Sequence, residues 1–74
     1  MTFTDYAYAV AKYVSKLTPL KVELVKNMEL FTYILYVDLN KDDMMCRFDL
    51  HDYFIADTFP MEAAKEIVKE CYEN

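Results

Sequence analysis

The sequence predicts an α+β fold in which N- and C-terminal helices pack on one face of a three-stranded antiparallel meander sheet. Apolar residues recur at helical spacing near both ends of the chain and at alternate positions in the middle. The segments between the predicted strands are too short for parallel crossovers, which need about a dozen residues or more. With 74 residues and 55% apolar content, the chain is expected to form one compact domain over residues 1–74.

The first helix is predicted over Phe3–Leu17. Thr2 is a suitable N-cap, and Asp5 in the first turn suits both a capping box and the positive end of the helix dipole. Pro19 ends the helix, because the residue before a proline avoids the helical region. The apolar stripe consists of Phe3, Tyr6, Ala7, Val10, Val14 and Leu17.

Three strands are predicted next, over residues 20–25, 29–39 and 44–50, with a tight turn at Lys26-Asn27. The second segment, ELFTYILYVDL, is rich in β-branched and aromatic residues and is the strongest strand signal in the chain. Alternation assigns an inward face to each strand. The inward residues are Leu20, Val22 and Leu24, then Phe31, Tyr33, Leu35, Val37 and Leu39, then Met44, Cys46, Phe48 and Leu50.

The stretch from His51 to Phe59 stays open between an extension of the sheet, a loop and a short helical turn. Pro60 then suits the first position of a last helix, which runs to the end of the sequence. Its predicted apolar stripe is Met61, Ala64, Ile67, Val68 and Cys71.

The composition excludes several functions. The chain has no glycine, so it lacks the glycine-rich loops that hold phosphates and dinucleotides, and its turns must use Asn and Asp. The net charge is −5, and it is concentrated in residues 38–74, with ten acids and four bases. Direct binding of nucleic acid is therefore excluded as the main activity, whereas a basic protein surface would be attracted.

The residues that usually carry catalysis are sparse. His51 is the one histidine, and neither Cys46 nor Cys71 has a His or a second Cys at metal-binding spacing. We therefore expect a non-enzyme without cofactor or metal. The sequence shows no secretory signal and no long apolar span, so we expect a soluble cytoplasmic protein with reduced thiols and no membrane association.

The segment DLNKDDMMCRFD allows two interpretations. Asp38, Asn40, Asp42 and Asp49 fall at positions one, three, five and twelve, as in a helix–loop–helix calcium site. However, Asp43 stands where such a loop needs glycine, and both flanks alternate like strands. A β-hairpin turning on Asn and Asp is the favoured interpretation, although cation binding by this hairpin stays open.

Two surfaces are candidates for binding a partner. If the helices cover one face of the sheet, the other face presents an apolar strip among charged residues, which is typical of an interface. The aspartates from Asp38 onward form an acidic surface whose spacing along a strand is similar to that of phosphates in a nucleic acid. The predicted contact residues are Ile34, Tyr36 and Met45 in the strip and Asp38, Asp42, Asp43, Asp49 and Asp52 in the acidic surface.

These features lead to two functional hypotheses. The first is a small acidic inhibitor or regulator that blocks a basic, nucleic-acid-binding surface of a larger protein. In being short, acidic, tyrosine-rich and free of catalytic motifs, the chain resembles phage-encoded inhibitors of host defence such as anti-CRISPR proteins. An antitoxin that masks a basic toxin fits the same charge argument. The alternative is a structural or assembly module that homodimerises or docks through the outer sheet face.

Overall fold

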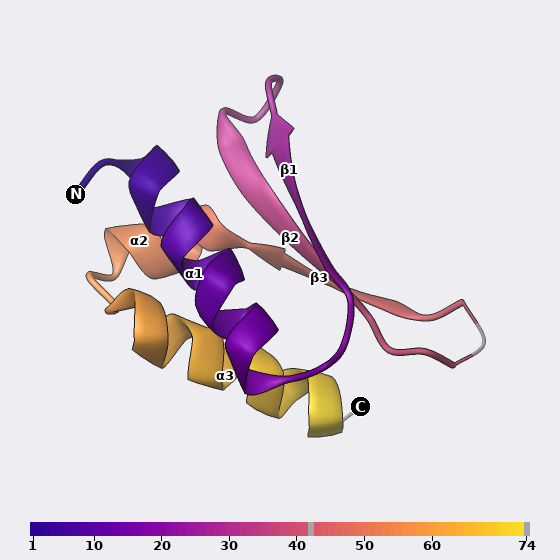
Figure 1. The fold of residues 1–74 in the computed structure, drawn as a ribbon. Helices are drawn as coiled ribbons and strands as arrows, with labels where there is room; N and C mark the ends of the chain where they lie inside the picture. The colour runs from indigo at the N-terminus through magenta and orange to yellow at the C-terminus, as the bar shows by residue number, and fades with distance from the viewer. Residues whose placement is uncertain (42, 74) are drawn as a thin grey trace.

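The computed structural model of the chain describes residues 1–41 and 43–73, and these form the predicted α+β fold (Figure 1). A helix is followed by a three-stranded antiparallel meander and then by a short and a long helix. The elements are α1 (Phe3–Leu17), β1 (Val22–Asn27), β2 (Thr32–Asp38), β3 (Met45–Asp49), α2 (Leu50–Ile55) and α3 (Pro60–Glu73).

The sheet has the order β1-β2-β3, so β2 is the central strand. Leu35 pairs with Leu24 on one side and with Phe48 on the other, and these side chains belong to the inner face. The next residue along β2, Tyr36, pairs with Glu23 and Arg47 on the outer face. The predicted alternation therefore assigns these residues to the correct faces of the sheet.

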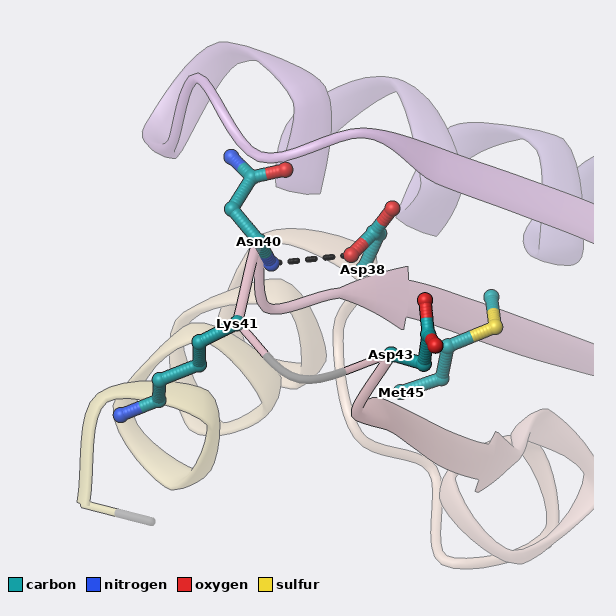
Figure 2. Close-up of a pocket in the computed structure, with 5 residues that line it drawn as sticks. All are labelled: Asp38, Asn40, Lys41, Asp43 and Met45. Atoms are coloured by element: carbon teal, nitrogen blue, oxygen red, sulfur yellow. Dashed lines mark hydrogen bonds between the residues drawn. The ribbon is translucent and has the colours of Figure 1, made fainter.

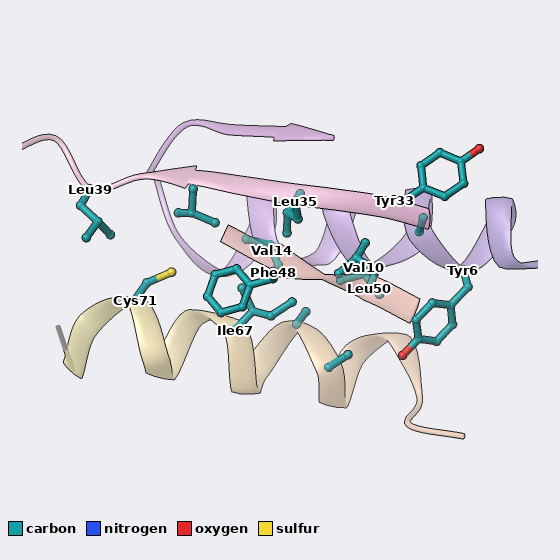
Figure 3. Packing of buried hydrophobic residues seen from close by; sticks show 14 residues of the cluster. Tyr6, Val10, Val14, Tyr33, Leu35, Leu39, Phe48, Leu50, Ile67 and Cys71 are labelled. Atoms are coloured by element: carbon teal, nitrogen blue, oxygen red, sulfur yellow. The ribbon is translucent and has the colours of Figure 1, made fainter. Parts of the chain in front are cut away.

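Helices α1 and α3 lie side by side on the inner face of the sheet (Figures 1 and 3). Each is amphipathic, so each buries one stripe of side chains. Thr2 caps α1 as predicted, because its side chain accepts a hydrogen bond from the Asp5 backbone N–H. At the opposite end of the layer, the hydroxyls of Thr18 and Tyr72 are 2.6 Å apart and hydrogen-bonded.

The core lies between the sheet and the helices (Figure 3). The predicted inward residues of β2 from residue 33 onward are buried, as are most of the predicted helix stripes. Ala63 is buried although it was not in the predicted stripe. The buried apolar cluster is Tyr6, Ala7, Val10, Val14, Tyr33, Leu35, Val37, Leu39, Phe48, Leu50, Ala63, Ala64, Ile67 and Cys71.

The first hairpin differs from the prediction. The turn expected at Lys26-Asn27 is wrong, since both residues continue β1 and the chain reverses over residues 28–31. The Asn27 side chain explains the shift, because its Oδ1 accepts hydrogen bonds from the backbone N–H groups of Glu29 and Leu30. Asn27 thus closes the turn from the end of the strand. Phe31, predicted to face inward, lies in this turn and is exposed.

The stretch from His51 to Phe59, for which the sequence allowed three structures, begins within helix α2. Asp49 caps it, since its side chain accepts a hydrogen bond from the His51 backbone N–H. His51 therefore belongs to a helix and does not extend the outer face of β3. Tyr53 and Phe54 of this helix are half-buried and pack against the core. Two further inward assignments are wrong, because Leu17, the last residue of α1, and Met44, the residue before β3, are both exposed.

Candidate protein-binding site

The loop between β2 and β3 is held by its own backbone and side chains (Figure 2). The Asp38 carboxylate accepts a hydrogen bond of 2.8 Å from the Asn40 backbone N–H. The Met44 N–H donates to the Lys41 carbonyl at 2.9 Å. Asn40 and Asp43 have φ angles of 59° and 57°, a left-handed conformation that Asn and Asp tolerate better than other non-glycine residues. The expectation that a chain without glycine turns on Asn and Asp is confirmed here.

A polar hollow of about 400 Å³ lies beside this loop. Its lining residues are Asp38, Asn40, Lys41, Asp43 and Met45 (Figure 2). A smaller hollow of about 100 Å³ shares Asp38 and Met45 with the first and extends along the outer sheet face to Tyr36. The two hollows therefore form one continuous surface. We call it the loop-end surface and define it by Tyr36, Asp38, Asp43 and Met45.

Ile34 does not belong to the loop-end surface. It was predicted to be presented on the outer face, but only 1% of the residue is exposed. Ile34 occupies the central strand, where its neighbours across the sheet are Val25 and Asp49. The prediction that the outer face offers it to a partner is wrong. The alternation of the predicted strand 29–39 places Leu30 on the same face as Ile34, but Leu30 lies in the β1–β2 turn.

The remaining predicted aspartates are dispersed. Asp49 is half-buried, and its Oδ1 accepts a hydrogen bond of 2.6 Å from the Thr32 hydroxyl in addition to capping α2. Asp52 lies on α2, which follows the C-terminal end of β3, whereas the β2–β3 loop precedes its N-terminal end. Asp42 lies outside the described residues. The aspartates thus come from different elements instead of following one strand in a phosphate-like series.

The contacts of Asp49 also bear on the calcium hypothesis. A calcium loop would need its twelfth residue to turn toward the ion, whereas the Asp49 carboxylate holds Thr32 and the start of α2. Within residues 1–41 and 43–73, no group of three or more His, Cys, Asp or Glu side chains is arranged to hold a metal.

His51 and Cys71, which were considered for catalysis or metal binding, pack against other side chains. The His51 ring packs edge-on against Phe3, with 5.6 Å between the ring centroids. Burial, followed by the neighbouring Cys46 thiol, raises the pKa of Cys71 to about 12. A thiol with so high a pKa is a weak nucleophile at neutral pH.

Sequence reasoning missed the part that β1 plays in this site. Lys21 and Glu23 line the smaller hollow together with Tyr36. They stand at the polar positions on either side of Val22, so the alternation did mark them as outward. Their place beside Tyr36 depends on the register of β1 with β2, in which Glu23 pairs with Tyr36. The predicted meander gave the neighbouring strand but not this register.

The chain matches no family model, no curated protein and no solved structure. A proposal of its function therefore depends on the geometry described above. None of the helices in the described part of the chain is long and apolar enough to cross a membrane.

Proposed function

We propose that this chain is an acidic protein-binding module that inhibits or regulates a larger partner by covering a basic, nucleic-acid-binding surface. The observation that carries the proposal is the convergence of four predicted contact residues, Tyr36, Asp38, Asp43 and Met45, on one surface. The sequence predicted these residue types from their charge and exposure. The antiparallel register brings them together, since Asp38 pairs with Met45 across the sheet.

The loop-end surface suits an arginine or lysine side chain of a partner. Asp38 and Asp43 offer carboxylates for charge-assisted hydrogen bonds. Met45 and the Tyr36 ring offer apolar surface for the aliphatic stem of the same side chain, and the ring offers its face to a guanidinium. Figure 2 shows the Lys41 side chain extending away from the two carboxylates, so it does not occupy their position.

The charge distribution supports the class of partner. The net charge of the chain is −5, and ten of its thirteen acids follow residue 37, among them Asp38 and Asp43 of the loop-end surface. A field of this sign steers the molecule toward the Lys- and Arg-rich grooves that hold nucleic acids. A protein bound in such a groove competes with nucleic acid for the same lysine and arginine side chains. Inhibition of a nuclease or a similar enzyme is therefore the expected outcome.

The second hypothesis, assembly through the outer sheet face, now depends on fewer apolar residues. With Ile34 buried, Tyr36 and Met45 are the members of the predicted strip that such an interface would use. The two functions respond differently to charge, because apolar assembly does not require the carboxylates of Asp38 and Asp43.

The test is a capture and competition experiment with the double variant Asp38→Asn, Asp43→Asn. Both substitutions preserve the turn, since Asn still accepts the hydrogen bond from residue 40 and tolerates the left-handed backbone. The wild-type chain is used to capture partners from its native host at low salt. Nucleic-acid binding by the captured partner is then measured by gel shift with and without the chain. We expect wild type to displace nucleic acid and the double variant to lose about tenfold or more in potency.

The matched control is Glu70→Gln, Glu73→Gln, which removes the same number of charges from exposed positions on α3. Under the proposal this control inhibits like wild type at equal salt. If both double variants inhibit equally, net charge and not the loop-end surface is responsible. A captured partner whose nucleic-acid binding is unaffected by the wild-type chain contradicts the proposed inhibition.

A further inference from the structure

The turn between β1 and β2 carries exposed apolar residues at its tip. Met28, Leu30 and Phe31 are between 61% and 80% exposed, and Phe31 is the most exposed of the three. The hairpin extends beyond the helical layer, so its tip stands clear of the rest of the chain (Figure 1). We call these three residues the apolar tip. Large apolar side chains gathered at such a position are typical of a contact surface.

The apolar tip is held in a defined shape at an energetic cost. Phe31 has a φ angle of 51°, which is uncommon for a bulky residue and costs about 1–2 kcal/mol. The Asn27 side chain fixes the turn through hydrogen bonds of 3.0 Å and 2.9 Å to the N–H groups of Glu29 and Leu30. A strained and preordered aromatic residue at a tip is suited to enter a hollow without losing much conformational entropy.

The same chain contains an apolar hollow of about 700 Å³ where α1 begins and α2 leads into α3. Three of its lining residues, Met1, Ile55 and Phe59, are between 63% and 79% exposed. Tyr6 and Phe54 form its inner wall, with their ring centroids 5.3 Å apart. We call this the end hollow.

The apolar tip and the end hollow lie at the same end of the molecule. Thr32 and Tyr33 follow directly on the tip, and the Tyr33 ring packs edge-on against Phe3 at 5.5 Å. Phe3 in turn stacks on Phe54 of the hollow at 5.0 Å. A short row of aromatic rings thus separates the two features. A two-fold axis that passes outside the surface of the chain, beside this row, would bring the tip of one copy to the hollow of the other.

We infer that two copies of this chain pair about such an axis, with the apolar tip of each copy seated in the end hollow of the other. The area supports a second copy as the occupant. Taking about 200 Å² for each large apolar residue, the exposed parts of the tip and of Met1, Ile55 and Phe59 amount to roughly 800 Å² per copy. A stable interface of standard size buries about 800 Å² on each partner.

This interface is distinct from the loop-end surface, which lies at the other end of the sheet, and the two respond to salt in opposite ways. Each copy carries a charge of −5, so added salt screens the repulsion between two copies and strengthens apolar pairing. Binding of a basic partner by Asp38 and Asp43 weakens with salt. Failure of one inference is therefore separable from failure of the other.

The first measurement is sedimentation equilibrium of the wild-type chain over a range of concentrations at low and high salt. The expected result is a reversible increase from 8.8 kDa to twice this mass, at lower concentrations when salt is added. A chain that keeps the monomer mass up to about 1 mM at both salt levels overturns the inference, since 1 mM corresponds to a negligible affinity.

Two substitutions test the contact without weakening the fold. Phe31→Asn places a residue that favours the left-handed backbone at the tip. Phe59→Ser improves the start of α3, because the Phe59 carbonyl accepts the hydrogen bond of the Ala63 N–H and so occupies the N-cap position, which Ser favours. Each should raise the dimer dissociation constant by about thirtyfold or more, as for a buried aromatic anchor. The control Leu17→Gln, at an exposed apolar position on the far end of α1, should leave it unchanged.

Mixing the two variants decides how the copies pair. A Phe31→Asn copy keeps its hollow and a Phe59→Ser copy keeps its tip, so the mixture regains one of the two contacts. We expect the mixture to associate more tightly than either variant alone. If mixing restores nothing, or if Leu17→Gln weakens the dimer as much as Phe31→Asn, the pairing of tip with hollow is wrong.

Discussion

The two turns of the sheet solve the same problem with different residues. Both reverse the chain without glycine, and both do so with residues at positive φ. The β2–β3 loop places Asn40 and Asp43 at these positions, and their side chains are polar and tolerant of the conformation. The β1–β2 turn places Phe31 there, a residue that the conformation disfavours.

The turn conformation explains the residues at positive φ in the β2–β3 loop but not the residue at positive φ in the β1–β2 turn. Asn40 and Asp43 satisfy the backbone of the turn, so the turn accounts for Asn or Asp at both positions. The choice of Asp at position 43 adds the carboxylate that the proposed site uses. Phe31 opposes the backbone preference and buries little of its own surface in the core. Its place at the tip therefore indicates a use outside the monomer, in keeping with the proposed pairing of tip and hollow.

The largest expected effect comes from a core substitution in β2, the strand that belongs to both hairpins. Leu35 is fully buried on the central strand, between Leu24 and Phe48. Leu35→Ala should lower the free energy of unfolding by about 2–5 kcal/mol through lost burial and a cavity. Urea denaturation followed by circular dichroism measures this loss. The control Val25→Ala, at an exposed outer-face position, should cost about 1 kcal/mol or less, and equal losses would contradict the assignment of the core to the inner face.

An intermediate effect comes from exchanging the left-handed residues of the two turns. Phe31→Asn should raise the free energy of unfolding of the monomer by about 0.5–1 kcal/mol, and Asn40→Phe should lower it by about 1–2 kcal/mol. Urea denaturation at low salt and low protein concentration keeps both variants monomeric for this comparison. Changes of the same sign in the two variants would show that strain does not distinguish the turns.

These turns also show how far the sequence determined the fold. The helix Phe3–Leu17 and the predicted first residue of the last helix, Pro60, match the structure because capping and proline signals are local. The β1–β2 turn was misplaced because Asn27 was interpreted as a turn residue. In the structure, it ends a strand and closes the turn with its side chain.

The candidate site was predictable in part for a similar reason. Charge and alternation selected Asp38, Asp43, Tyr36 and Met45, which the structure brings together. The same alternation selected Ile34, because it shows which face a residue occupies but not how much its neighbours on a central strand cover it. Asp49 was predicted to belong to the acidic surface, and its hydrogen bond with Thr32 depends on the register of β2 and β3, which no local pattern reveals.

The smallest effect at neutral pH concerns Tyr53 of helix α2, which packs against the core. Burial, and then the nearby acids Glu70, Glu66 and Asp52, raise the pKa of Tyr53 from its ordinary value of 10.0 to about 12. The folded state thus holds this proton more tightly than the unfolded chain does. The stabilisation is fully present below pH 10.0 and is lost as the pH rises toward 12.

Tyr53→Phe removes the ionising hydroxyl and keeps the ring against the core. At pH 7 the free energy of unfolding should change by about 0.5 kcal/mol or less, as for a side chain that loses no essential contact. Between pH 10 and 12, stability should fall less steeply than in wild type, because the substituted ring has no proton to lose. Cys71, whose pKa is also raised to about 12, titrates in both proteins, so the difference between the two curves isolates Tyr53. Parallel curves throughout this range would mean that Tyr53 ionises as readily in the folded state as in the unfolded chain.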